Sequence, residues 1–144
     1  FVINVKEDSL VDVVVTPSEK TTYVLGDDFS YKGLKVEATY ESGKTEDVTE
    51  KSTPVVPDMA SIGKKTVSVT YNDIEKTFDI IISTKGDVNY DGRVSLADVV
   101  LVAKAVLNDD ADPNSPAVVF GDVNAEVGLS LADVTTLAKT VMDA

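Results

Sequence analysis

The chain has 144 residues without Cys, His or Trp, and its 13 basic and 25 acidic residues give a formal charge of -12. That length accommodates one ordinary domain or two small ones. The missing Cys and His exclude disulfides, thiolate zinc sites and the usual general base at neutral pH. The acidity disfavours a nucleic-acid partner, which needs Lys and Arg at its phosphates. Hard cations with oxygen ligands suit such a chain.

The first residues form an apolar run, Phe1–Val5 (FVINV), that is similar to Phe78–Ile82 (FDIII). We therefore predict that residues 1–9 are the end of a preceding module or a linker. The longest apolar stretch, Val99–Leu107, is interrupted by Lys104. It falls far short of the ~20 residues that span a bilayer, so no membrane insertion is expected.

Residues 10–83 have the pattern of short strands. Apolar and polar residues alternate in several runs, which is typical of strands half buried against a core. Asn72 and Asp73 tolerate positive φ and predict a tight hairpin. The expected strands are Val11–Val15, Tyr23–Leu25, Leu34–Tyr40, Lys65–Tyr71 and Ile74–Ile82.

The same region resembles the bacterial immunoglobulin-like domains of cell-surface and secreted proteins. The resemblance rests on Lys20–Asp27 (KTTYVLGD), Gly33–Val48 (GLKVEATYESGKTEDV) and Gly63–Ile82 (GKKTVSVTYNDIEKTFDIII). It implies a β-sandwich that acts as a spacer or as a stabilising neighbour of another module.

A duplicated unit fills the rest of the chain. A shift of 35 positions aligns Gly86–Leu107 with Gly121–Met142, and 12 of these 22 positions are identical by direct count. Such identity indicates an internal repeat. Each copy ends in a segment of helical period, Leu96–Leu107 or Leu131–Met142. The polar stretch between the copies, Asn108–Pro116, is predicted to be mostly loop.

The first copy has the pattern of an EF-hand calcium loop. Oxygen side chains occupy loop positions 1, 3, 5, 9 and 12, and Gly92 at position 6 permits the sharp bend. Position 7 contributes its main-chain carbonyl, and Asp replaces the usual Glu at position 12. The alternative is an Asp-rich turn with a helix cap. The predicted ligands in this first loop, residues 87–98, are Asp87, Asn89, Asp91, Arg93, Ser95 and Asp98.

The second copy is less regular. Position 5 is Glu126, position 6 is the β-branched Val127, and Gly128 follows one place late. Positive φ is costly for a β-branched residue, so this loop must bend differently. We predict a second calcium site of altered geometry or weaker affinity; the alternative is a decayed loop kept as a turn. The predicted ligands in this second loop, residues 122–133, are Asp122, Asn124, Glu126, Gly128, Ser130 and Asp133.

No helix precedes the first loop, because only Ser83–Gly86 separates the last expected strand from Asp87. Duplicated loop-then-helix units with Asp at position 12 resemble the dockerin module of cellulosome-type assemblies. The resemblance implies calcium-dependent, extracellular docking to a cohesin of a scaffoldin or cell-surface protein. It places partner contacts at loop positions 10 and 11 and along the helices. A Leu-Ala pair at positions 10 and 11 departs from the hydroxyl pair of many dockerins, which leaves the cohesin class open.

The helices themselves predict a partner surface. Leu131–Met142 is amphipathic, whereas Leu96–Leu107 is apolar nearly all round and cannot be buried by one helix contact alone. Its second face either binds a partner or packs against the β domain. The predicted partner-binding residues are Leu96, Ala97, Val100, Leu101, Ala103, Lys104, Leu107, Leu131, Ala132 and Lys139.

We therefore expect two domains, an all-β immunoglobulin-like sandwich at residues 10–83 and a small all-α calcium-binding dockerin at residues 84–144 with duplicated EF-hand-like loop-helix units. An Ig-like domain that is fused to a dockerin is commonly called an X-module. The short junction predicts that the two domains pack together.

Three other functions compete with docking. A calcium sensor would need a Met-rich groove, and the chain has only Met59 and Met142. An enzyme such as a glycosidase needs two carboxylates across a cleft, and the best-ordered acids here are assigned to metal. A cell-surface carbohydrate-binding or adhesin-type Ig module with a calcium-stabilised appendage is the main alternative. Its stacking side chains would be Tyr23, Tyr31, Tyr40 and Tyr71, of which alternation assigns the last two to the core face.

Overall fold

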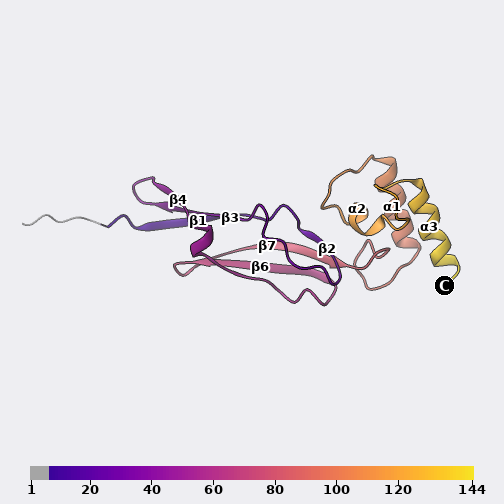
Figure 1. Cartoon of the computed structure of the whole chain (residues 1–144), viewed down its shortest axis with the longest axis horizontal. Helices are drawn as coiled ribbons and strands as arrows, with labels where there is room; N and C mark the ends of the chain where they lie inside the picture. The colour runs from indigo at the N-terminus through magenta and orange to yellow at the C-terminus, as the bar shows by residue number, and fades with distance from the viewer. Residues whose placement is uncertain (1–6) are drawn as a thin grey trace, which may run out of the picture.

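The computed structural model describes residues 7–144 of the chain. In this part of the chain, a β-sandwich forms one end of an elongated molecule and three helices form the other, C-terminal end (Figure 1). The similarity between Phe1–Val5 and the last strand lies outside the described residues.

Seven strands of the described region form two sheets. One sheet has three strands in the order β1-β3-β4, and the other has four in the order β2-β7-β6-β5. All neighbours pair antiparallel except β2, which runs parallel to β7. The strands are β1 Leu10–Thr16, β2 Thr22–Val24, β3 Lys35–Tyr40, β4 Thr45–Asp47, β5 Thr53–Val55, β6 Gly63–Tyr71 and β7 Ile74–Ser83.

The apolar residues of the alternating sequence pattern lie in the sandwich core. Val36 and Ala38 of β3 and Val67 and Val69 of β6 are fully buried, while their sequence neighbours point away from the core. The predicted hairpin between β6 and β7 is also confirmed, because Asn72 and Asp73 have φ values of 46° and 67°.

Two strands and a single helical turn were not predicted. Strands β4 and β5 have three residues each, too few to show an alternating pattern, and β5 contains Pro54 at the edge of its sheet. The 3-10 turn Thr49–Lys51 connects them.

Helices α1, Leu96–Leu107, and α3, Leu131–Met142, have the predicted bounds. Between them lies α2, Pro116–Gly121, which was not predicted because six residues are too short to show helical periodicity. Pro is well suited to the first helical position, where its missing N–H costs nothing. The three helices and the first loop share one core, formed by Val88, Val102, Ala105, Ala117, Phe120 and Leu137.

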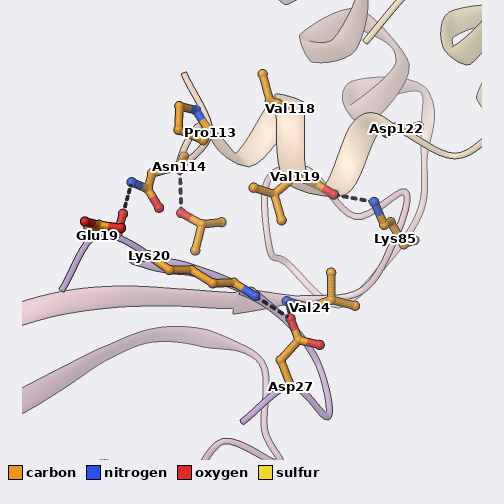
Figure 2. Close-up of a pocket in the computed structure, with 11 residues that line it drawn as sticks. Glu19, Lys20, Val24, Asp27, Lys85, Pro113, Asn114, Val118, Val119 and Asp122 are labelled. Atoms are coloured by element: carbon orange, nitrogen blue, oxygen red, sulfur yellow. Dashed lines mark hydrogen bonds and ion pairs between the residues drawn. The ribbon is translucent and has the colours of Figure 1, made fainter. Parts of the chain in front are cut away.

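The sandwich and the helices pack directly against each other, as the short junction predicted. Val24 of β2 and Ile81 of β7 lie against the helical core. Asn114 bonds across the junction, accepting from Thr21 N–H at 2.7 Å and donating to the Glu19 carbonyl at 2.8 Å. These contacts border a groove of about 520 Å³ between the two parts (Figure 2).

A lysine side chain closes the other side of this groove. Lys85 Nζ donates to the Val119 carbonyl at 2.7 Å (Figure 2), and Gly86 N–H donates to the Phe120 carbonyl at 2.7 Å. The junction segment is therefore tied to the C-terminal half of α2. Among residues 7–144, the helices are all too short or too polar to cross a bilayer.

Candidate functional site

The first loop is closed by hydrogen bonds among its predicted ligands. The fully buried Asp87 carboxylate accepts from Asp91 N–H at 3.1 Å and from Gly92 N–H at 2.9 Å. Asn89 Oδ1 accepts from Asp91 N–H at 3.2 Å, and Asp91 Oδ1 accepts from Arg93 N–H at 2.9 Å. The structure thus brings loop positions 1, 3 and 5 into one network, with the exposed Arg93 following them.

Asp98 closes this loop from its other end. Its fully buried carboxylate accepts from Val88 N–H at 2.8 Å and from Asn89 N–H at 3.2 Å through Oδ1. Through Oδ2 it accepts from Ser95 N–H at 2.8 Å, and Ser95 Oγ accepts from Ala97 N–H. Ser95 and Asp98 form a capping box. The last predicted ligand is therefore fixed both to the loop and to the first turn of α1.

The second loop repeats this closure. Asp133 Oδ1 accepts from Val123 N–H at 2.9 Å and from Asn124 N–H at 3.2 Å, and Oδ2 accepts from Ser130 N–H at 2.9 Å. Ser130 and Asp133 form a second capping box at the start of α3. The sequence repeat is thus a structural repeat at the point where each loop enters its helix.

The beginnings of the two loops differ. In the part of the chain that the structure describes, Asp122 makes none of the main-chain hydrogen bonds that Asp87 makes in the first loop. The Asn124 side-chain nitrogen is buried without a hydrogen-bond partner. Its counterpart on Asn89 donates to Asp91 Oδ2 at 2.9 Å. Position 5 of the second loop is instead a longer, exposed Glu, so the side-chain contact between positions 3 and 5 is lost.

The bend also falls at different positions. Gly92, at position 6 of the first loop, has φ 89°, whereas Gly128, at position 7 of the second, has φ 93°. Val127, at position 6, is fully exposed and avoids positive φ. The prediction that the second loop bends differently is confirmed. Position 4 has positive φ in both loops, at Tyr90 and Ala125.

The loops contain buried carboxylates that no basic side chain neutralises. Asp87, Asp98 and Asp133 are fully buried. Within residues 7–144 the ion pairs lie between positions 12 and 79, in the sandwich, and none reaches these three side chains. Burying a charge is costly unless hydrogen bonds or a cation compensate it. All three carboxylates accept hydrogen bonds from main-chain N–H groups of their own loops, and a bound cation would compensate their charge further.

The donor set fits calcium in the first loop. Carboxylate, amide and hydroxyl oxygens together with main-chain carbonyl oxygens are the ligands that Ca²⁺ takes. Among residues 7–144, however, no group of three or more acidic side chains is close enough to hold a metal ion by itself. The loop carboxylates are engaged with the loop N–H groups. The second loop offers the same kinds of oxygen atom around a displaced bend, so it fits less well, and calcium binding at either loop is a proposal.

Helix α1 exposes a continuous apolar face. The exposed fractions are 62% for Leu96, 50% for Val100, 37% for Leu101 and 79% for Leu107. We call this surface the docking face, after the prediction that it binds a partner; it consists of Leu96, Ala97, Val100, Leu101, Lys104 and Leu107, all of which are exposed.

The opposite side of α1 packs into the helical core through Val102 and Ala105, while Ala103 is half-buried. The sandwich contacts this core through Val24 and Ile81. It leaves the docking face exposed, so the alternative in which the second face of α1 packs against the β domain is wrong.

Helix α3 presents the equivalent face with a different chemistry. Leu131, Ala132 and Lys139 are exposed, and their partner binding stays a prediction. At the centre of the face, however, α3 has Thr135 and Thr136, whose hydroxyls donate to carbonyl groups of their own helix. The two helices therefore offer unequal surfaces, one apolar and one largely polar.

Sequence reasoning missed one side chain beside the first loop. Ser83, the last residue of β7, is fully buried, and its hydroxyl donates to Asp87. A polar residue at the end of an apolar strand was the available signal. Also missed was a groove of about 410 Å³ beside the docking face, between the first loop and α1, whose lining includes Tyr90, Leu101 and Asp110.

Comparison with known families identifies the sandwich. Residues 16–81 match the family model of the bacterial Ig-like domain (group 3). The match starts at the end of β1 and ends within β7, so it covers the β-rich part of the chain. The predicted Ig-like fold is thereby confirmed for this part, and the three helices lie outside the match.

Two enzymes have segments similar to this chain. Pectate lyase L of Thermoclostridium stercorarium is 34% identical over 84 residues, which cover 57% of this chain and 7% of that enzyme. The exo-β-1,6-galactobiohydrolase of Bifidobacterium longum subsp. longum is 34% identical over 80 residues, covering 51% of this chain and 5% of that enzyme. The chain thus spans less than a tenth of either protein.

A solved lipoprotein of Bacteroides thetaiotaomicron is also similar, with 21% sequence identity and a TM-score of 0.32. The similarity covers 51% of this chain and 38% of that protein.

Proposed function

We propose that this chain is a non-catalytic, calcium-dependent docking module. Its helical part is a dockerin that binds a cohesin of a scaffoldin or cell-surface protein outside the cell, and its Ig-like domain stabilises or spaces that dockerin. The observation that carries the proposal is the docking face. A helix that buries one side in its own core and exposes four large apolar residues on the other is suited to a protein partner.

The docking face has the composition of an interface centre with a polar rim. Val100 and Leu101 lie in its middle, and Lys104 adds a positive charge beside them. A few residues that become fully desolvated at the centre of an interface supply most of its binding energy, while charges at its rim mainly steer association. The threonines at the equivalent positions of α3 favour one preferred binding orientation over two.

Calcium would act on this face through the first loop. Asp98 is both a predicted ligand and the capping partner of Ser95 at the start of α1. Holding Asp98 in place therefore holds the first turn of the helix that bears the docking face. Bound calcium also supplies the positive charge that the buried carboxylates lack.

The matched relatives support a setting of carbohydrate breakdown. Both enzymes with similar segments act on carbohydrates, as their names state, and this chain matches only a small part of each. We place the chain in a cellulosome-type, polysaccharide-degrading complex, where such a segment would attach its parent protein.

The test is a pull-down of the full chain against a panel of cohesin domains, in calcium and in chelator. We expect capture by at least one cohesin in calcium and none in chelator. Val100→Asp or Leu101→Asp should weaken the affinity for the captured cohesin by about 2 kcal/mol, roughly 30-fold, because each places a charge at the centre of a desolvated interface.

The chain supplies its own matched controls. Thr135→Asp and Thr136→Asp place the same charges at the equivalent positions of α3, and they should change affinity much less. Equal losses from both helices would contradict the assignment of α1 as the main surface, and unchanged affinity for the Val100 and Leu101 variants would refute it.

If no cohesin is captured in calcium, the hypothesis of a carbohydrate-binding or adhesin-type module gains support, and affinity gels with polysaccharides test it. The structure indicates which tyrosine could stack on a sugar. Among the candidate stacking residues, Tyr23 is fully buried, while Tyr31 has 54% of its surface exposed. A Tyr31→Ala variant would be the first to compare in those gels.

A further inference from the structure

Ser83 connects the Ig-like domain to the first predicted ligand of the first loop. It is the last residue of β7 and is fully buried. Its main-chain carbonyl accepts from Leu25 N–H at 2.8 Å, beyond the end of β2. Its Oγ donates a bifurcated hydrogen bond to Asp87, at 2.9 Å from Oδ2 and 2.8 Å from the Asp87 carbonyl oxygen. One residue of the sandwich thus holds both β2 and Asp87.

The hydroxyl of Ser83 completes the set of groups that orient Asp87. Oδ2 of Asp87 accepts from this hydroxyl and from Gly92 N–H, and Oδ1 accepts from Asp91 N–H. Of these donors only Ser83 lies outside the loop. Side chains that hydrogen-bond to a metal-ligating residue fix the orientation of that residue, and their loss typically costs 10–100-fold in metal affinity.

The second copy of the repeat lacks a hydroxyl at the corresponding distance before its loop, and it also differs from the first copy at positions 5 and 6. The shift of 35 positions places Val118 of α2 where the first copy has Ser83. Asp122, which corresponds to Asp87, makes none of these hydrogen bonds among the described residues. The hydroxyl and the hydrogen bonds to the first ligand are thus present together in the first copy, and neither is found in the second copy among the described residues.

We infer that Ser83 is a positioning residue through which the Ig-like domain sets the calcium affinity of the first loop. The inference rests on the proposed calcium dependence and adds a role for the neighbouring domain. Because binding linkage is reciprocal, calcium in the first loop also stabilises the β2–β7 end of the sandwich.

Tyr90 provides a readout that is specific to this loop. It lies at position 4 of the first loop, where the second loop has Ala125. Terbium binds oxygen ligands in place of calcium and luminesces when a nearby tyrosine is excited. Titration of the full chain with terbium therefore reports the first loop, and competition with calcium gives its calcium affinity. A Tyr90→Phe variant should abolish the signal and leave calcium uptake, measured by calorimetry, unchanged.

The decisive comparison is between Ser83→Ala and Ser18→Ala. Ser18 is also buried, and its hydroxyl donates to the Lys20 carbonyl at 2.9 Å within the Ig-like domain. Ser83→Ala should lower first-loop affinity by about tenfold, whereas Ser18→Ala should leave it unchanged. Equal affinities in the two variants would overturn the inference.

A nearly isosteric pair protects the test against a variant that folds poorly. Ser83→Thr and Ser83→Val add almost the same bulk, but only Thr keeps the hydroxyl. The inference requires the Thr variant to bind calcium more tightly than the Val variant, and equal binding contradicts it. A wild-type chain that binds no calcium at all would overturn both this inference and the calcium dependence of the proposed function, whereas calcium binding without cohesin capture would leave the role of Ser83 intact.

Discussion

At the scale of a single residue, the two loops differ in which position carries the glycine of positive φ. Gly92 adopts φ 89° at position 6, and a side chain on it would approach Ile62 of the Ig-like domain, with 3.2 Å between the added Cβ and Ile62 Cδ1. Gly128 adopts φ 93° one position later, with open space around it. Both glycines adopt positive φ, but only Gly92 lies against the sandwich.

We predict that Gly92→Ala destabilises the chain by about 1–2 kcal/mol, because an L-residue at positive φ is strained. It should also weaken the first loop, which is measured by thermal unfolding and by Tyr90-sensitised terbium titration. Gly128→Ala has the same backbone cost and is the matched control. Its terbium curve should follow that of the wild type, and an equal shift in both variants would show that the strain is not specific to the first loop.

At the scale of elements, ion pairs link the strands of the sandwich. Asp79 of β7 pairs with Lys64 of β6 at 3.1 Å and accepts from the Thr66 hydroxyl at 3.0 Å. The Lys64 ammonium, followed by the Thr66 hydroxyl, lowers the pKa of Asp79. Because this pKa is lower in the folded than in the unfolded chain, the pair stabilises the fold above the ordinary aspartate pKa of about 3.9. That contribution is lost as the pH falls through the folded-state pKa.

The expected result is that Asp79→Asn has its largest effect on the melting temperature at neutral pH, and that the difference from wild type shrinks below about pH 4. Asp73→Asn, which removes an exposed turn carboxylate outside the ion pairs of the described residues, should show no such trend. Thermal unfolding of the full chain over a pH series measures both. Both variants keep the same loops, so parallel pH trends would mean that the Lys64 pair is not the cause.

At the scale of the whole molecule, two modules share one boundary. The helical part is a module of some 60 residues without disulfides, and such a module is marginal by itself. Saturating one calcium site at 100 times its Kd would add roughly 2.7 kcal/mol. The sandwich has its own core, which includes Val13, Val36 and Val69. Calcium should therefore matter most for the helices and for the strand end that contacts them.

We predict that chelation unfolds residues 86–144 and leaves the sandwich folded. Circular dichroism should lose its helical signal. In hydrogen exchange, the Thr21 amide should lose protection, because its acceptor Asn114 Oδ1 belongs to the helical part. Amides in the β6–β7 hairpin should stay protected. A helical signal that persists in chelator would contradict the prediction.

The sequence alone determined what depends on neighbours along the chain. Alternation located the long strands, and the helical period placed α1 and α3 at their observed bounds. The displaced Gly128 predicted the different bend of the second loop. Short elements such as α2 and β4 were missed, because three to six residues carry too little pattern.

Only the tertiary structure decided which groups meet across the chain. Thr21 and Asn114 are 93 residues apart in sequence, and no local pattern predicts their hydrogen bond. The same holds for the hydroxyl of Ser83 behind Asp87, which depends on how β7 enters the loop. The exposure of the docking face also required the structure, since an all-round apolar helix is compatible with burial on either side. Packing between elements fixed that face, because Val24 and Ile81 occupy the helical core and leave the outer side of α1 exposed.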